Sequence, residues 1–483
     1  MATTYKTPGV YVEEITKFPP SIAPVETAIP AFIGYTQIAE EYAPGDLTLK
    51  PTKIYALVDY EKFFGFPQKE EKITVKITVK TTGPAPINKA VASVAEADRS
   101  KHLMYYALQM YFANGGGPCY IVSVGPYKAL GTALVETEME KGLDVLKKAD
   151  EPTLIVCPEA ITLSITDFGK FQDLALAQCA DLKDRFVIMD VHGDTISLSE
   201  PGSDMSEVIN NFQKAIDNFR GSGVGINNLK YGAAYAPNLE TVLDFLVDET
   251  KIDVTTDRDG VVSGPVKLDT LQASNNQVYE QARAAIRDLP CKMTPSSTMA
   301  GIYAAVDNSR GVWKAPANVS VSAIDQPTIQ FSDKFQDGMN VDATAGKSIN
   351  AIRTFPGKGT IVWGARTLAG NDNEWRYISV RRFFIFVEES TKKATAQFVF
   401  EPNDANTWVR VQGMIENFLT VQWRQGALQG VKPEHAFYVA VGLGKTMTAL
   451  DILEGRMNIE IGMAVVRPAE FIILKFSHMM AQS

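Results

Sequence analysis

The stretch "TLIVCPEAITLSITDFGKFQDLALAQCADLKDRFVIMDV" (153–191) contains two short apolar runs separated by a longer amphipathic segment. The runs at 153–158 and 185–191 have the length and the β-branched content of buried strands, whereas "FQDLALAQCADLK" between them has the periodicity of a helix. Strands that are buried on both faces of a sheet carry such continuous apolar runs. The stretch therefore predicts a strand–helix–strand unit with parallel strands.

The same alternation extends on both sides of this unit. Buried strands are expected at "AFIGYT" (31–36), "CYIVSV" (119–124) and "KYGAAYAP" (230–237), and helices at 101–117 and 206–219. "EEKITVKITVK" (70–80) alternates with a period of two, which indicates a strand or a hairpin in a polar environment. The fold class that this order predicts is α/β, with a three-layer domain between residues 101 and 345.

The composition is that of an ordinary soluble protein, with 45% hydrophobic and 21% charged residues among 483. A chain of this length can form two or three domains with large cores. No apolar stretch reaches the length of a membrane span, and "MATTYKTPGV" lacks the apolar centre of a signal peptide, so we expect neither membrane insertion nor Sec export. The four cysteines form no CxxC pair, which favours buried thiols in a reducing cytoplasm over disulfides or zinc.

The charge is unevenly distributed along the chain. The net charge of −9 argues against nucleic acid as a main partner. Residues 345–483, however, carry a net charge of +4, so the rest of the chain carries −13. This asymmetry suggests two surfaces with different neighbours.

The stretch "VAVGLGKTMTALD" (439–451) contains GLGKT, which is similar to the end of a nucleotide-binding P-loop. A Walker A loop begins with a glycine that lets backbone N–H groups surround the phosphates, but Val439 occupies that place here. A strand that holds magnesium normally follows such a loop, whereas the best acidic candidate, ending at Asp190, precedes it. A strand that runs into a glycine turn is the favoured interpretation. A P-loop enzyme that uses Lys445 is kept as the alternative.

Three other patterns are weak candidates for binding sites. "GSGVG" (221–225) follows a helix and precedes a strand, the reverse of the order in a dinucleotide-binding loop. Asp190, His192 and Asp194 could bind a metal from one side of a strand, but a solvated loop at the strand end is favoured. "TTDRDG" (255–260) lacks the first acid and the final glutamate of an EF-hand. No histidine belongs to a recognisable nucleophile motif, so we expect no enzyme, no metal and no cofactor.

After residue 345 the pattern changes. Strands are expected at 360–367, 435–441 and 457–466, a helix at "EWRYISVRRFFIFVEEST" (374–391), and a strand that runs into a helix cap at "QFVFEPND" (397–404). A further helix starts near Asn403. Its apolar face consists of Trp408, Val411, Ile415, Phe418 and Leu419. Arg410, Asn417 and Arg424 lie on the opposite face, which is polar and basic.

The two ends of the chain have an unusual character. "EFIILKFS" (470–477) is apolar on both faces, and such a strand needs neighbours on both sides. Either it is a central strand of its own domain, or it is added to a sheet of another subunit. The start of the chain, "YKTPGVYVEEI" (5–15) followed by a proline-spaced segment, is typical of an extended arm. Together the two ends suggest a protein that polymerises.

Several motifs follow one another along the chain: "YKTPGVYVEE", "IPAFIGYT", "GVWKAPANV", "INAIRTFPGKGTIVWGARTL", "WRYISVRRFFIFVEES", "FVFEPNDANTWVRV", "WRQGALQG" and "IGMAVVRPAEFIILKFS". Together they closely resemble the contractile tail sheath proteins of phages and of phage-tail-like injection systems. The motifs are densest after residue 345, and the ending "AEFIILKFSH" is more similar to injection-system sheaths. The regions around 70–90 and 240–295 are the least similar to the family.

The resemblance implies a domain organisation. An N-terminal linker arm would comprise residues 1–25, the start of the sheath domain with a β-rich insertion 26–100, inserted α/β outer domains 101–345, a C-terminal sheath core domain 346–468, and a C-terminal strand or arm 469–483. The arms would add strands to the core sheet of a neighbouring subunit. Their residues here are Tyr5, Pro8, Gly9, Val10, Tyr11 and Val12, and Glu470, Phe471, Ile472, Ile473, Leu474 and Phe476.

The resemblance also implies a function. Subunits would form stacked hexameric rings around an inner tube and would contract to drive it through a target membrane, with energy from subunit repacking rather than nucleotide hydrolysis. The implied partners are further copies of the chain, the inner tube, baseplate and tail-terminator proteins, and sister sheath proteins. Assembly is expected in the bacterial cytoplasm. Arg410, Asn417 and Arg424 could face an acidic inner tube, or solvent alone. A monomeric α/β binding protein, with both ends packed in their own chain, is a third alternative.

Overall fold

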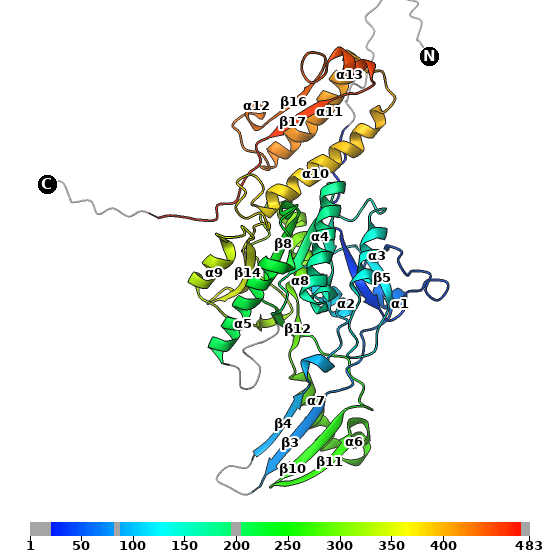
Figure 1. Ribbon diagram of the computed structural model, residues 1–483, viewed down its shortest axis with the longest axis vertical. Coiled ribbons are helices and arrows are strands. Elements are labelled where there is room, and N and C mark those ends of the chain that lie inside the picture. The colour runs from blue at the N-terminus through cyan, green and yellow to red at the C-terminus, as the bar shows by residue number, and fades with distance from the viewer. Residues whose placement is uncertain (1–20, 82–86, 195–203, 475–483) are drawn as a thin grey trace, which may run out of the picture. The chain divides into compact units, whose positions relative to one another are not determined.

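The computed structural model describes residues 21–81, 87–194 and 204–474 (Figure 1). The chain divides into two compact units. The larger comprises Glu26–Phe386 with Arg467–Ser483, and the smaller comprises Met1–Val25 with Val387–Val466. None of the helices in the described ranges combines the length and the apolar character that a membrane span requires.

The large unit is built on an eight-stranded sheet of order β15-β14-β8-β7-β6-β1-β5-β2. Its strands are β1 (Pro30–Thr36), β2 (Thr52–Ile54), β5 (Cys119–Pro126), β6 (Leu154–Val156), β7 (Phe186–Asp190), β8 (Gly232–Ala236), β14 (Ile349–Phe355) and β15 (Gly359–Trp363). The central strands are parallel, and only the outer pairs with β2 and β15 are antiparallel. The predicted buried strands are confirmed, because every residue of β1, β6, β7 and β8 is buried.

Helices pack on both faces of this sheet. The pair α2 (Met104–Ala113) and α8 (Pro295–Arg310) packs against β1, β6, β7 and β8, and the pair α3 (Glu136–Leu146) and α4 (Ile165–Leu182) packs against β1, β5 and β7. The remaining helices of this part are α1 (Leu57–Phe64), α5 (Met205–Asn218) and α9 (Asp333–Asn340). The three-layer α/β architecture expected from the sequence is therefore confirmed. Strands β14 and β15 follow residue 345 and still join this sheet.

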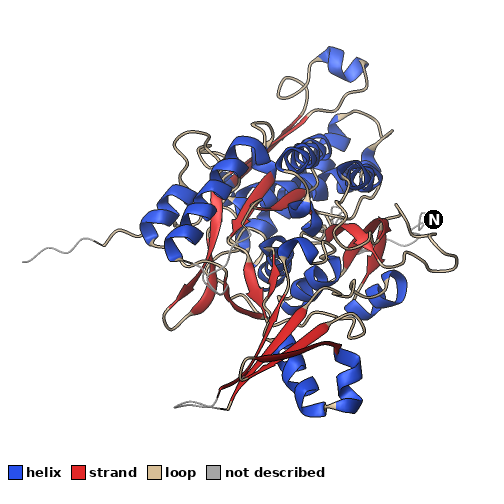
Figure 2. Ribbon diagram, turned by 60° about the horizontal axis from the view of Figure 1, so that its bottom comes forward, coloured by secondary structure: helices blue, strands red, loops and turns tan. Residues whose placement is uncertain are grey.

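A second lobe of the large unit has its own sheet and its own apolar cluster. Its sheet, of order β11-β10-β3-β4, consists of β3 (Thr74–Lys80), β4 (Ile87–Ser93), β10 (Asp253–Arg258) and β11 (Val261–Lys267). Helices α6 (Leu268–Ser274) and α7 (Asn276–Arg287) supply the rest of the cluster, and Figure 2 shows them beside the long strands. Of the strand or hairpin predicted for residues 70–80, the strand is confirmed as β3, and its antiparallel partner β4 lies beyond that range. The two regions least similar to the sheath family thus form one lobe, which we call the outer lobe.

A three-stranded sheet of order β12-β9-β13 completes the large unit. It consists of β9 (Leu239–Thr241), β12 (Cys291–Met293) and β13 (Ile324–Pro327).

The small unit is a helix packed against a two-stranded sheet. Helix α11 (Ala405–Arg424) begins where the Asp404 carboxylate accepts a hydrogen bond from the Thr407 N–H, and it packs against β16 (Phe437–Val441). The other elements are β17 (Ile459–Met463), α12 (Pro433–Ala436) and α13 (Ala449–Leu453). Helix α10 (Ile378–Thr395) contributes residues to both units. The apolar face predicted for α11 is confirmed, because Val411, Ile415, Phe418 and Leu419 are buried.

One element of this region was predicted incorrectly. The strand expected in "QFVFEPND" is absent from these described residues, and a short 3₁₀ turn, Ala396–Phe398, takes its place. Helix α10 continues to Thr395, so only a turn fits between it and the cap of α11 at Asp404. Phe398 is buried, whereas Val399 and Phe400 point into solvent.

Candidate assembly interface

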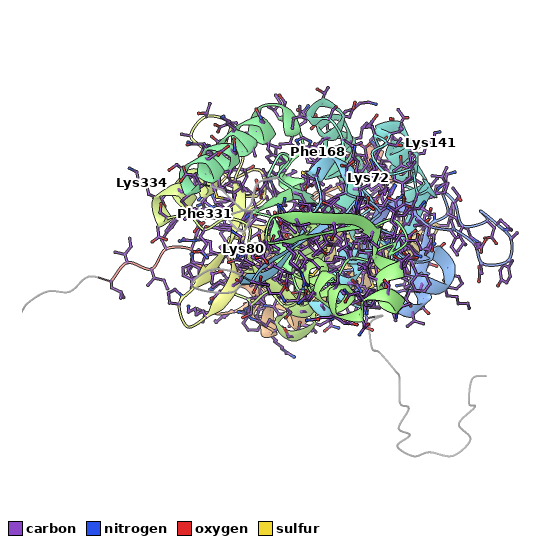
Figure 3. The ribbon with its side chains drawn as sticks, turned by 90° about the horizontal axis from the view of Figure 1, so that it is seen from below. Lys72, Lys80, Lys141, Phe168, Phe331 and Lys334 are labelled. Carbon is purple, nitrogen blue, oxygen red and sulfur yellow. The ribbon has the colours of Figure 1, made fainter. Side chains whose placement is uncertain are left out.

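The last described segment, residues 467–474, forms no helix and no strand within its own chain. Phe471, Ile472, Ile473 and Leu474 are 70%, 79%, 79% and 72% exposed. Figure 3 shows the side chains of this segment projecting from an extended trace. Exposing four such side chains forgoes about 1.5–3 kcal/mol of burial each. The alternative of a central strand in the chain's own fold is therefore wrong for these four residues.

Glu470 fixes the base of this segment to the large unit. Its carboxylate accepts hydrogen bonds from Arg366, at 2.9 Å from Nε and 2.6 Å from Nη2, and from the Asn340 amide at 2.7 Å. The Tyr377 hydroxyl donates a further bond at 3.2 Å. Burial opposes ionisation of Glu470, but the bonds from Arg366 and Asn340 outweigh it and lower the pKa of the carboxyl group. Glu470, predicted as part of an intersubunit arm, therefore has its contacts within its own chain.

The N-terminal arm residues Tyr5, Pro8, Gly9, Val10, Tyr11 and Val12 lie outside the described residues, as does Phe476. The N-terminal side of the large unit is held by a buried ion pair. Arg382 on α10 binds both carboxylate oxygens of Asp307 on α8, at 3.0 and 2.6 Å. The Thr27 hydroxyl donates a hydrogen bond to the same carboxylate. The backbone carbonyl of Thr27 accepts a hydrogen bond from Arg382 at 2.9 Å. The backbone that leads into β1 is thereby fixed to two helices.

The sheet of the small unit has two free edges in the described part of the chain. Strands β16 and β17 pair only with each other, in the register Phe437↔Met463 to Val441↔Ile459. The Ala464 N–H donates to the Ala436 carbonyl, and hydrogen-bonded pairs alternate along an antiparallel ladder. The backbone groups that point outward are therefore those of Phe437, Val439 and Val441 on β16, and of Ile459, Ile461 and Met463 on β17. A two-stranded sheet is marginal alone, and these edges can accept further strands.

The polar face predicted for α11 is exposed. Arg410, Asn417 and Arg424 all lie in solvent. Arg410 is not wholly free, because its guanidinium lies 5.4 Å from the centre of the Phe398 ring and 3.9 Å from the Glu401 carboxylate. Gly413 lies between Arg410 and Asn417, and a Cβ atom there would have no neighbour within 4 Å. The face therefore presents two arginines and an asparagine to solvent, with open space above Gly413.

The GLGKT string forms a closed turn, as predicted. The backbone N–H groups of Lys445, Thr446 and Met447 all donate to the Gly442 carbonyl, at 3.1–3.2 Å. The Thr446 hydroxyl donates to the Asn458 carbonyl at 2.6 Å. A phosphate-binding loop needs its amides directed at the ligand, whereas these amides are used inside the turn. The strand that runs into a glycine turn is confirmed.

The turn after β7 reaches solvent at Gly193, as the prediction of a solvated loop requires, but the carboxylates of Asp190 and Asp194 on either side of it are buried. Asp190 accepts bonds from the Ser296 N–H (2.7 Å) and hydroxyl (2.6 Å), and Asp194 accepts one from the Asn238 N–H at 2.7 Å. His192 bonds the Leu163 carbonyl at 2.8 Å. The three side chains therefore have separate partners. Within the described ranges no group of three metal-binding side chains is present.

The two glycine-containing patterns, "GSGVG" and "TTDRDG", lie in a connection and in a strand with its turn. "GSGVG" lies after α5 and before β8, and "TTDRDG" runs along β10 into the turn before β11. The four cysteines are free and buried.

The sequence reasoning missed Arg366 and Arg382. Both lie in motifs that were interpreted only as strand or helix. A signal was present, since an arginine inside a buried apolar stretch needs a partner. The partners, at Glu470 and Asp307, are too far along the chain for any local pattern to name.

Comparisons with known proteins agree with this geometry. Residues 370–477 match the phage tail sheath C-terminal domain. The sheath complex of the extracellular contractile injection system PVC, in its contracted state, is 29% identical, with a TM-score of 0.61 over 99% of this chain and 98% of that one. The contracted helical sheath of the anti-feeding prophage is also 29% identical, with a TM-score of 0.61 over 98% and 99% of the two chains. A chain of the anti-feeding prophage baseplate is also 29% identical. Its TM-score is 0.61, over 99% of this chain and 100% of that one.

A comparison with curated protein sequences finds no match. The structural likeness nevertheless extends over nearly the whole chain, and the sequence match covers most of the small unit and the exposed C-terminal segment. The chain thus carries a phage tail sheath C-terminal domain on the fold of the contractile sheath proteins, which confirms its resemblance to that family.

Proposed function

We propose that this chain is the structural subunit of a contractile sheath, in an injection system rather than a phage tail. The choice of an injection system is supported by the three structures at 29% identity, which come from the injection system PVC and the anti-feeding prophage. The observation that carries the proposal is the C-terminal segment. A segment of the length of a short strand leaves the fold with four exposed apolar side chains, while its base is fixed by partly buried hydrogen bonds from Arg366 and Asn340 to Glu470.

Strand exchange links the subunits. Residues 471–476 of one copy, and residues 5–15 of another, add to the free edges of the β16–β17 sheet of a third, while Glu470 stays bound within its own chain. Main-chain hydrogen bonds supply affinity in such an addition, and alternate side chains supply specificity. The N-terminal arm (1–25), the core (346–468) and the C-terminal arm (469–483) act as the linking parts. Residues 26–100 begin the sheath domain with its β-rich insertion, and residues 101–345 form the outer domains.

Contraction uses energy stored in packing. Subunits form stacked hexameric rings in an extended lattice around the inner tube and repack into a wider and shorter one. A gain of about 1 kcal/mol per subunit is sufficient when it is summed over a long sheath. The closed GLGKT turn supports a mechanism without nucleotide hydrolysis, and hence a protein that is not an enzyme.

The exposed face of α11, with Arg410, Asn417 and Arg424, contacts the acidic inner tube. Baseplate, tail-terminator and sister sheath proteins are the further partners. Assembly takes place in the bacterial cytoplasm, before the particle acts on a target cell.

Negative-stain electron microscopy of the purified protein, alone and with the inner tube, tests the proposal. Long hollow striated tubes are the expected result in at least one of the two samples. Dispersed monomers in both samples, and again after addition of the baseplate, would contradict a sheath function.

A further inference from the structure

The C-terminal segment has a fixed part and a free part. The fixed part is held at two points, by the bonds to Glu470 and by the bond from Arg467 Nη1 to the Asn373 carbonyl at 2.9 Å. The free part begins at the next residue, Phe471, which is 70% exposed. The change from fixed to free thus occurs between two adjacent residues.

Arg366 is itself held rigidly by the core of the large unit. Its N–H donates to the Asn350 side-chain oxygen at 2.7 Å, and its carbonyl accepts from the Asn350 side-chain nitrogen at 2.8 Å. Asn350 lies on β14, is fully buried, and also donates to the Ala234 carbonyl on β8. The Arg366 side chain is only 4% exposed. A continuous series of hydrogen bonds therefore connects the parallel sheet to the arginine.

The other contacts of Glu470 come from two further elements. Asn340 is the last residue of α9, and its carbonyl also accepts from Arg366 Nη1 at 3.2 Å. Tyr377 directly precedes α10. Arginine, asparagine and tyrosine thus surround one carboxylate from three directions, which fixes both its position and the direction in which the chain continues.

We propose that Arg366 is a positioning residue for assembly: by holding Glu470, it sets the direction in which residues 471–474 leave the subunit towards the free sheet edge of a second copy. This inference rests on the proposed sheath function. Ordering a flexible segment costs free energy at the moment of binding, and a segment that is already held at its base loses less. The clamp therefore strengthens strand addition without itself touching the neighbouring copy.

Two measurements test the clamp separately from the sheath. In the first, a spin label is attached to Ile472→Cys in the full chain, below the concentration at which tubes form. The four native cysteines are buried and do not compete for the label. Glu470→Ala and Glu470→Gln are each expected to increase the mobility of the label. Glu470→Ala also leaves the buried Arg366 without its carboxylate and should lower the melting temperature, so Glu470→Gln, which keeps hydrogen-bonding groups at this place, is compared with it. Glu374→Ala, which removes an exposed carboxylate in the same region, is the control and leaves the mobility unchanged.

In the second, the same variants without the label are assembled into tubes. The concentration needed for assembly is expected to rise at least about tenfold for Glu470→Ala and to stay constant for Glu374→Ala. Equal label mobility in Glu470→Ala and the wild type would overturn the clamp, as would equal assembly. If the wild type forms no tubes while the label responds as expected, the sheath function fails and the clamp on the segment stands.

Discussion

At the scale of single residues, the buried ion pair between Arg382 and Asp307 is expected to have a large effect on stability. Both side chains are under 5% exposed, at 3% and 4%, and the pair also binds Thr27. Removal of one partner leaves a buried charge without compensation, which costs about 3–5 kcal/mol. Asp307→Ala should therefore lower the free energy of unfolding by that amount, as measured by urea denaturation. Asp144→Ala, in an exposed pair with Lys147, is the control and should change it by less than about 1 kcal/mol.

Asp190 gives the stability a pH dependence. Burial raises the pKa of its carboxyl group from 3.8 to about 6, although the bonds from Ser296 oppose the rise. The folded state thus binds the proton more tightly than the unfolded state between these two values. Binding of this proton therefore stabilises the folded state at low pH. As the pH rises through about 6 this stabilisation is lost, and the free energy of unfolding falls by up to about 3 kcal/mol.

Asp190→Asn should remove this dependence. Urea denaturation at about pH 4.5 and about pH 7.5 measures the free energy of unfolding of the wild type and of the variant. Between these two pH values the difference between their free energies of unfolding should change by about 1–3 kcal/mol, and the change should favour the variant at the higher pH. A difference that stays the same at both pH values would mean that Asp190 is ionised throughout.

At the scale of elements, the outer edge of β17 allows a test with a matched control. The N–H of Ile461 points away from β16, so proline at this position removes a donor that only an added strand would use. Ile461→Pro should fold as a monomer and fail to form tubes. Ile461→Ala removes a similar volume but keeps the N–H, and it should still assemble. Electron microscopy distinguishes the two, and tubes formed by the proline variant would show that this edge accepts no strand.

The basic face of α11 gives a second test at this scale. Reversal of charge in Arg410→Glu with Arg424→Glu should impair assembly on an acidic inner tube, because both side chains are exposed on one helix face. The same charge change in Lys80→Glu with Lys89→Glu, in the outer lobe, should leave assembly unaffected. Co-sedimentation with the inner tube measures both variants. Equal binding by the two pairs would mean that the α11 face is only solvated.

The elements that the sequence predicted best are those governed by local chemistry. Strands β5–β8 were predictable because continuous apolar runs fit only a sheet covered on both faces. The strand predicted in "QFVF" was wrong because its aromatic residues are also common in strands. Only the length of α10, which continues to Thr395, excludes a strand there. The parallel pairing of β3 with β10 and the bond from Arg366 to Glu470 join residues far apart in the chain. The periodicity of apolar residues along a sequence does not indicate contacts between residues so far apart.

At the scale of the whole molecule, we expect the two ends to decide whether the chain remains a monomer. The exposed segment 471–474 is a liability for a protein that acts alone, since it invites aggregation. Deletion of residues 1–15 should leave a folded, soluble monomer that cannot polymerise. Size-exclusion chromatography and electron microscopy measure both properties. Long tubes formed by the truncated chain would show that the N-terminal arm is dispensable.

The outer lobe has a consequence for the history of the chain. It consists of two excursions from the main fold, residues 74–93 and 253–287, and β3 from the first lies between β4 and β10 in one sheet. Loss of the first excursion alone would uncover one edge of β10 and remove Val75, Ile77 and Ala92 from the apolar cluster, and loss of the second would uncover β3 and remove most of the cluster. We therefore expect neither excursion to be stable without the other. In evolution the two must therefore be inherited, exchanged or lost together, as one module encoded in two places.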